Sequence, residues 1–131
     1  MNTPCYVIDS DALRRNLSVL QEVTQRTGAH ILLAQKAFSC YALYPMIGQY
    51  LCGATASGLY EARLCHEEMP GGENHVFSPA FKAEDVDELV DICDHIVFNS
   101  LRQLSLYGAK AREAGCSVGL RINPEKSTQE G

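Results

Sequence analysis

The sequence lacks the segments that would carry a protein into or across a membrane. Its longest apolar stretches, such as Ile31–Ala34 and Ile96–Phe98, are far too short to span a bilayer. Its amino terminus has neither the charged nor the apolar region of a secretory signal peptide. It also has no basic run, and 11 basic against 16 acidic residues give a net charge of −5. We therefore expect a cytoplasmic protein that binds neither a membrane nor a nucleic acid.

Paired cysteines and metal-binding motifs are missing as well. The six cysteines are spread along the chain with no CxxC pair, so in the reducing cytosol we expect free thiols that act as small apolar residues. His66-Glu67 resembles the start of the zinc motif HExxH, but Pro70 occupies the second histidine position and breaks the required helix. The other histidines fall mostly at the starts of predicted strands (His30, His75 and His95). We therefore assign no metal.

What is present suffices for one globular domain. Hydrophobic residues make up 46% and charged residues 21% of the 131 residues, as in an ordinary soluble domain. Strand-like and helix-like patterns alternate without a linker. The predicted strands are residues 30–38, 53–57, 75–78, 95–99 and 117–123. The predicted helices are residues 10–27, 45–51, 61–68, 83–94 and 101–114.

Turn and capping residues support these boundaries. Ser10 is the predicted N-cap of the first helix, which presents Leu13, Leu17, Leu20 and Val23 on one face. Gly28 follows the end of that helix, Ser100 caps the last one, and Gly115 ends it.

The spacing of the strands indicates a parallel sheet. They begin near residues 31, 53, 75, 95 and 117, so each β-α unit is about 20 residues long. A doubly wound sheet of five strands fits this length, whereas a complete (β/α)8 barrel needs roughly 250 residues. After the fifth strand the chain continues through Asn123–Gly131 with no helix to cover that strand. We therefore predict an α/β fold made of the first five units of a parallel (β/α) barrel.

Lys36 is the most informative residue, because it stands inside the apolar run of the first predicted strand. In both architectures functional groups gather at the carboxyl ends of the strands. A lysine with buried neighbours needs a partner or a chemical role, and desolvation lowers its pKa toward the neutral amine that Schiff-base chemistry needs. Alternatively, Lys36 has simply reached the solvated end of the strand. The local pattern alone leaves both interpretations open.

A family resemblance favours the chemical role. The segments Thr3–Asp9 and Leu33–Ala37 resemble the "TP-aromatic-V-aliphatic-D" and "YA-x-KA" motifs of pyridoxal-phosphate-dependent decarboxylases with the alanine-racemase fold. That group includes diaminopimelate, ornithine and arginine decarboxylases. Further similarities follow in register at Ala56–Ala62, Phe77–Lys82, Phe98–Leu104 and Leu120–Pro124. The wording of Ser57–Leu64 and Arg121–Glu125 is most similar to the branch that decarboxylates carboxynorspermidine and carboxyspermidine in polyamine biosynthesis.

The resemblance implies a fold, a cofactor and a set of site residues. The fold would be a (β/α) barrel of pyridoxal-phosphate fold type III, of which residues 10–131 form an incomplete part and residues 1–9 a strand of a second, β domain. Lys36 would be the catalytic residue that binds pyridoxal 5′-phosphate covalently. Arg121, Ser57 and Glu61 would bind or orient the cofactor. Arg121 could instead form an ion pair at the strand end, and Glu61 could simply favour the helix dipole.

The resemblance covers essentially this whole chain but only the front part of such an enzyme. In relatives, later strands bring a histidine that stacks on the pyridine ring, a glycine loop for the phosphate and an acid for the ring nitrogen. The partner domain brings an active-site cysteine. We therefore expect a homodimeric carboxy-lyase at full length, acting on a carboxylated polyamine, and no activity from residues 1–131 alone.

Three alternatives stay open. Within the family, the substrate could be a simpler amino acid such as diaminopimelate or ornithine. The chain could instead be a truncated remnant without catalysis. It could also be an open-sheet binding module that uses Lys36 to hold an anion.

Overall fold

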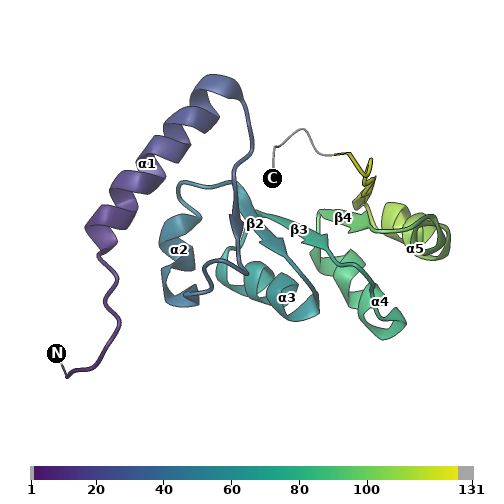
Figure 1. Cartoon of the computed structure of the whole chain (residues 1–131), viewed down its shortest axis with the longest axis horizontal. Helices are drawn as coiled ribbons and strands as arrows, with labels where there is room; N and C mark the ends of the chain where they lie inside the picture. The colour runs from purple at the N-terminus through teal and green to yellow at the C-terminus, as the bar shows by residue number, and fades with distance from the viewer. Residues whose placement is uncertain (1, 127–131) are drawn as a thin grey trace.

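The computed structural model describes residues 2–126 and contains one sheet of five parallel strands. The strands are β1 (Leu32–Ala34), β2 (Gly53–Ala56), β3 (Glu73–Phe77), β4 (His95–Phe98) and β5 (Ser117–Leu120). Each strand pairs with the next one along the chain, in the order β1-β2-β3-β4-β5 (Figure 1). This order excludes the doubly wound alternative, in which the first strand lies inside the sheet. The predicted α/β fold with a consecutive parallel sheet is confirmed.

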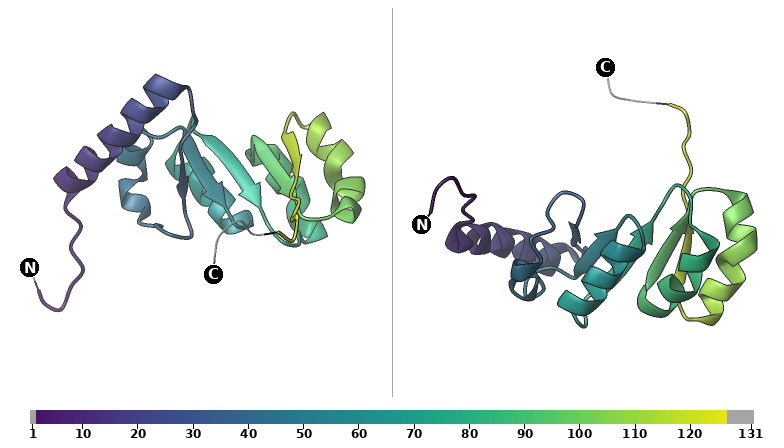
Figure 2. Two further views of the ribbon diagram at one scale, coloured as in Figure 1. Left: turned by 45° about the horizontal axis from the view of Figure 1, so that its top comes forward. Right: turned by 90° about the horizontal axis from the view of Figure 1, so that it is seen from below.

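The helices cover one face of the sheet. They are α1 (Ser10–Thr27), the 3-10 turn η1 (Tyr41–Leu43), α2 (Tyr44–Ile47), α3 (Leu59–Glu68), α4 (Ala83–Ile92) and α5 (Leu101–Glu113). Figure 2 shows α2 to α5 along the same side of the strands, with α1 beyond β1. We call the side under α2 to α5 the covered face and the other side the open face. Within residues 2–126, no helix is both long and apolar enough to cross a bilayer.

Side-chain alternation along the strands separates the two faces. In β4, Ile96 and Phe98 are buried on the covered face, whereas His95 and Val97 are only half-buried on the open face. The main core unites covered-face residues of β2 to β4 with α3, α4 and α5, and it includes Val86 and Leu89. A second core, around Tyr44 and Ile47, lies under β1 and β2.

Gly53 allows β2 and β3 to pair closely. A Cβ atom at this position would lie 1.9 Å from the carbonyl oxygen of Glu73, which is closer than any real side chain approaches. Its φ of +157° is also one that L-residues rarely adopt. Gly53 therefore fixes the start of β2 beside the start of β3, where the register pairs Gly53 with Glu73.

The structure corrects several predicted boundaries. Asp9, not Ser10, is the N-cap of α1, because its carboxylate accepts hydrogen bonds from the amides of Asp11 and Ala12. The predicted apolar face of α1 is only partly covered: Leu17 is buried, but Leu20 and Val23 are exposed. The second helix, predicted over residues 45–51, is shorter than expected: α2 ends at Ile47 and is followed by a turn, and η1 precedes it.

Two strands are shorter than expected. β1 ends at Ala34 instead of Phe38, and β5 ends at Leu120 instead of Asn123. Other limits agree closely with expectation. Gly28 ends α1 in the left-handed conformation, and Ser100 caps α5 by accepting a hydrogen bond from the amide of Gln103. Residues 2–9 form no strand within the part of the chain that the structure describes, and their assignment to a second domain stays a prediction.

Candidate functional site

Lys36 lies in a tight turn directly after β1. The ladder between β1 and β2 ends with the Gln35 amide 3.4 Å from the Thr55 carbonyl, and the Ala37 amide then turns back to the Ala34 carbonyl at 2.9 Å. Lys36 is exposed, so the expectation of a lysine inside a buried strand is wrong. Because β1 already ends at Ala34, Lys36 lies beyond the strand, at its solvated end. Within residues 2–126, no ion pair or hydrogen bond involves its ammonium group.

Gln35 fixes this turn from inside the protein. Its side chain is only 1% exposed, and its amide nitrogen donates to the carbonyl of Glu61 at 2.9 Å. A weaker contact of 3.4 Å joins its amide oxygen to the hydroxyl of Tyr44, which also lies 3.3 Å from the carbonyl of Phe38. The pKa of Tyr44 is raised above its usual value, mainly by burial, so this hydroxyl stays protonated and able to donate. The Lys36 turn is therefore held at both ends.

Ser57 lies in the turn between β2 and α3, and Glu61 lies in the first turn of α3. The Glu61 carboxylate accepts a hydrogen bond of 2.6 Å from the Ser57 amide, while the Glu61 carbonyl accepts from Gln35. Glu61 thus stabilises the start of α3 and joins that turn to the Lys36 turn. Its carboxylate is engaged with backbone, as a first-turn glutamate on the helix would be.

Arg121 follows β5 on the open face. Its amide donates to the carbonyl of Phe98 at 2.8 Å, and its guanidinium carbon lies 5.1 Å from the centre of the Phe77 ring. This cation–π contact holds a positive charge beside the end of β3. Within residues 2–126, the alternative of an ion pair at Arg121 is not observed.

The sheet register brings these residues to the same end of the sheet, where the strands have their carboxyl termini. Ala34 pairs with Thr55, and Thr55 pairs with His75. Lys36, Ser57 and Phe77 each stand two residues further on, at the carboxyl ends of three neighbouring strands. Arg121 lies at the same end of the sheet, directly after β5. No hydrogen bond in the described part of the chain links Lys36 directly to Ser57, Glu61 or Arg121. These residues share the carboxyl-terminal end of the sheet, and the Lys36 turn is connected to Glu61 only indirectly, through the Gln35 side chain.

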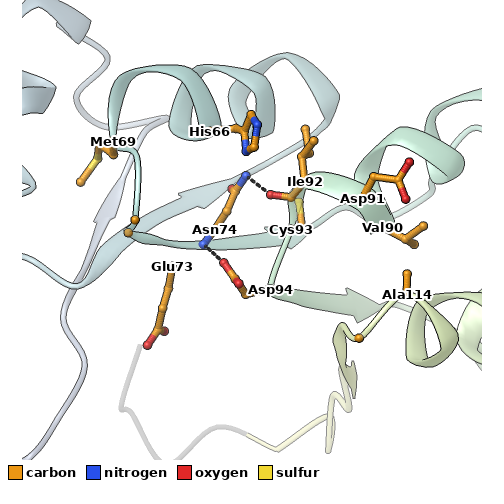
Figure 3. Close-up of a pocket in the computed structure, with 13 residues that line it drawn as sticks. His66, Met69, Glu73, Asn74, Val90, Asp91, Ile92, Cys93, Asp94 and Ala114 are labelled. Carbon is orange, nitrogen blue, oxygen red and sulfur yellow. Dashed lines mark hydrogen bonds between the residues drawn. The ribbon is translucent and has the colours of Figure 1, made fainter.

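The opposite end of the sheet has a cavity of about 410 Å³ among the amino-terminal ends of β3 and β4. The side chain of Asn74 donates to the carbonyls of Ala62 and Ile92, and its backbone amide donates to the Asp94 carboxylate. Figure 3 shows the contacts to Ile92 and Asp94. In α/β folds of this kind the amino-terminal end is the stability face. We therefore read Asn74 as a residue that ties α3 and α4 to the sheet.

Sequence reasoning missed two features. One is Gln35, which looks like an ordinary member of an apolar run. The other is a polar cluster on the open face, where a Glu73 carboxylate oxygen lies 2.8 Å from His75 Nε2 and the rings of His75 and His95 stack at 3.9 Å. The Glu73 carboxylate is also hydrogen-bonded to His30, and these contacts, led by that from His75, lower the pKa of Glu73. The signal that could have revealed the cluster is that His75 and His95 occupy corresponding positions in two successive strands.

Comparison with known proteins adds the decisive observation. No family model matches the chain. The carboxynorspermidine/carboxyspermidine decarboxylase of Herminiimonas arsenicoxydans is 43% identical over 124 residues, which are 95% of this chain and 33% of that protein. The enzyme of the same name from Campylobacter jejuni is 41% identical over 127 residues, or 97% of this chain and 32% of its own length. The chain is homologous to a part of these decarboxylases.

Solved structures agree with the sequence comparison. The crystal structure of carboxynorspermidine decarboxylase from Campylobacter jejuni, complexed with norspermidine, superposes with a TM-score of 0.91 at 40% identity. It is matched over 100% of this chain and 35% of its own. A carboxyaminopropylagmatine decarboxylase from Synechocystis sp. is 37% identical over 125 residues. The chain thus spans about a third of the decarboxylases that it matches, and the predicted resemblance is confirmed.

Proposed function

We propose that this chain is the cofactor-lysine part of a pyridoxal-phosphate-dependent decarboxylase that acts on carboxynorspermidine or carboxyspermidine in polyamine biosynthesis. The observation that carries the proposal is the 41–43% identity to two decarboxylases of that name over almost the whole chain. Lys36 supports it independently, because an accessible amine at the carboxyl end of a strand is where a parallel α/β fold presents reactive groups.

The residues at this end of the sheet fit an aldehyde cofactor because they offer an amine for its covalent attachment. The groups that would bind its phosphate and its ring would come from other parts of the complete protein. Lys36 offers a primary amine that no acidic group neutralises within residues 2–126. Gln35 and Tyr44 hold the turn that carries it, and Arg121 supplies a cation on Phe77. When bound, the cofactor accepts the electron pair that remains as carbon dioxide leaves.

Each residue of this chain has a defined part in that chemistry. Lys36 would hold the cofactor, and Gln35 would keep the turn that carries this lysine in place. Arg121 would present positive charge to an anionic group of the cofactor or substrate. Ser57 and Glu61 would shape the neighbouring turn, Glu61 through its contacts to the Ser57 amide and the Gln35 side chain.

The substrate class follows from what the relatives' names share. Carboxynorspermidine and carboxyspermidine are carboxylated triamines, so each carries a secondary amine between its amino-acid group and its second primary amine, which diaminopimelate and ornithine lack. The 37% identity to the Synechocystis enzyme makes carboxyaminopropylagmatine a second candidate substrate. Diaminopimelate and ornithine are the comparison substrates against which the proposal is tested.

We also infer a second domain, a homodimer and a cytoplasmic location for the complete enzyme. Residues 2–9 support the first point, because the structure gives them no strand of their own although Tyr6 and Val7 are exposed at 105% and 63%. Apolar residues of β character that remain uncovered are suited to pairing with another element. Deleting residues 1–9 from the complete enzyme should therefore lower its stability. The sheet of residues 10–126 should stay intact in the shortened form.

Borohydride trapping tests the role of Lys36. Pyridoxal phosphate is added to the protein, the adduct is reduced, and peptide mapping locates the label, which we expect on Lys36. Lys36→Arg should remove the dominant label and leave only background labelling of other lysines, and the matched variant Lys82→Arg should keep the dominant label. A dominant label on Lys82 or Lys110 would show that Lys36 is not the cofactor residue.

A second assay tests the substrate. The complete protein should release carbon dioxide from carboxylated triamines much faster than from diaminopimelate or ornithine, with carboxyaminopropylagmatine as the comparison that separates the two candidates. Equal or faster release from diaminopimelate would assign the protein to the simpler amino-acid decarboxylases. Residues 1–131 alone should release none above background.

A further inference from the structure

Three potential metal ligands converge on the open face away from Lys36. Glu73, His75 and His95 each offer one donor atom, and these atoms all lie within 4.8 Å of one another. The three side chains are half-buried, neither fully solvated nor sealed in the core. The cluster belongs to no role described above, and the sequence motifs do not reveal it because the donors come from two different strands.

The fold places these donors on rigid backbone. Glu73 and His75 are separated by two positions on β3, so both project from the same face, opposite to Asn74. Figure 3 shows the Glu73 side chain leaving the strand on the side opposite to the Asn74 side chain. His95 is the direct register partner of His75 on β4, and their rings stack with centroids 3.9 Å apart. Donors on paired strands hold their positions better than donors on loops.

We propose that Glu73, His75 and His95 form a binding site for a divalent transition-metal ion, with Zn²⁺ as the reference ion. Two imidazoles and one carboxylate are a donor set that zinc uses when it keeps a fourth position open. Tetrahedral coordination with bonds of about 2.0–2.1 Å places donors roughly 3.3 Å apart, so the stacked rings of His75 and His95 must turn out of their present arrangement to direct one nitrogen each at the ion. The contact between Glu73 and His75 at 2.8 Å is a hydrogen bond and is shorter than that spacing, so an ion must replace this bond and separate the two donors slightly.

His30 has a supporting position in this arrangement. It is hydrogen-bonded to the Glu73 carboxylate from the segment before β1, and its side chain is largely exposed. A ligating carboxylate that is itself hydrogen-bonded is the usual pattern around protein-bound metals. His30 would orient Glu73 while the ion occupies the space among Glu73, His75 and His95. A purely hydrogen-bonded cluster, by contrast, would take up no metal.

Metal uptake by the untagged protein separates these two cases. After incubation with Zn²⁺ and dialysis, elemental analysis should find one ion per chain. His95→Phe keeps a stacked ring but removes the donor, and it should weaken Zn²⁺ binding by more than about 100-fold, beyond the loss that an outer partner causes. The matched control His66→Ala, an exposed histidine outside the cluster, should retain the ion. His30→Ala should reduce affinity by a smaller factor.

The free thiols require a second readout, because Cys5 is exposed and could bind Zn²⁺. Co²⁺ replacement distinguishes the donors, since a thiolate ligand adds an intense near-ultraviolet band that nitrogen and oxygen ligands lack. We expect the visible bands of a tetrahedral Co²⁺ site without the thiolate band. Absence of a retained ion, equal affinity in His95→Phe, or a thiolate band would each overturn the proposal.

Discussion

The two faces of the sheet differ in what they hold. On the covered face, successive strands contribute Ala56, Val76, Ile96 and Phe98, all buried beneath α3, α4 and α5. On the open face, the same strands contribute Thr55, Glu73, His75 and His95, and no helix of residues 2–126 lies over that face (Figure 2). Because consecutive residues of one strand point in opposite directions, a single segment serves both purposes.

This difference teaches how stability and reactivity are divided. Apolar burial against the helices supplies the free energy of folding, while polar groups on the open face keep their hydrogen-bonding capacity for one another and for ligands. The Lys36 turn is the place where the two meet, because the exposed lysine is held by Gln35, which is buried.

Adjacent residues of β4 give the largest expected contrast. Ile96→Ala removes a side chain that is 0% exposed and should lower the free energy of unfolding by about 2–5 kcal/mol. Val97→Ala, on the open face, should cost no more than about 1 kcal/mol. Urea unfolding followed by circular dichroism measures both. Equal losses would mean that the open face is also packed.

Gln35→Leu tests whether the covered side controls the lysine. The substitution keeps the size of the side chain but leaves the carbonyl of Glu61 without its donor, which should cost about 1–3 kcal/mol of stability. The rate of pyridoxal-phosphate labelling at Lys36 should fall, while labelling at Lys110 stays unchanged. Gln25→Leu, an exposed position on α1, is the matched control. An unchanged labelling rate at Lys36 would show that its turn does not need Gln35.

The smallest effect concerns the buried thiols of the covered side. Burial raises the pKa of Cys93 to about 12, against 9.0 for an ordinary thiol. Above pH 9.0 the unfolded chain loses this proton while the folded chain keeps it, so stability should fall as the pH rises toward 12. We expect a loss of about 1 kcal/mol between pH 9 and 10.

Denaturant midpoints at increasing pH measure this loss. Cys93→Ala should flatten the dependence, whereas Cys5→Ala, which removes an exposed thiol, should leave it unchanged. A slope that Cys93→Ala does not alter would assign the alkaline sensitivity to other groups.

Local sequence patterns predicted the fold well, because hydrophobic periodicity and capping residues depend mainly on neighbours within a few positions. The expected strand starts near 31, 53, 75, 95 and 117 compare with observed starts at 32, 53, 73, 95 and 117. Gly28 and Ser100 were identified correctly because their roles depend on neighbours within a few residues. The helical periodicity of α1 likewise identified an apolar face, but it could not say how much of that face is covered, and Leu20 and Val23 are exposed.

Features that depend on distant partners could not be predicted in the same way. The run from Ile31 to Phe38 looks like one buried strand, yet its pairing stops at Ala34 and the side chain of Gln35 turns to the carbonyl of Glu61, 26 residues away. The position of Lys36 as the family's cofactor residue came from resemblance and stays a prediction. The cluster of Glu73, His75 and His95 required the register between β3 and β4.

The consecutive strand order also bears on how the protein is made. Each strand pairs with the one synthesised just before it, about 20 residues earlier, so no strand must wait for a distant segment of chain. As the polypeptide leaves the ribosome, every new β-α unit can dock onto a sheet edge that already exists. Assembly can therefore follow the direction of translation, with β5 as the growing edge of the described sheet and the Lys36 turn formed early.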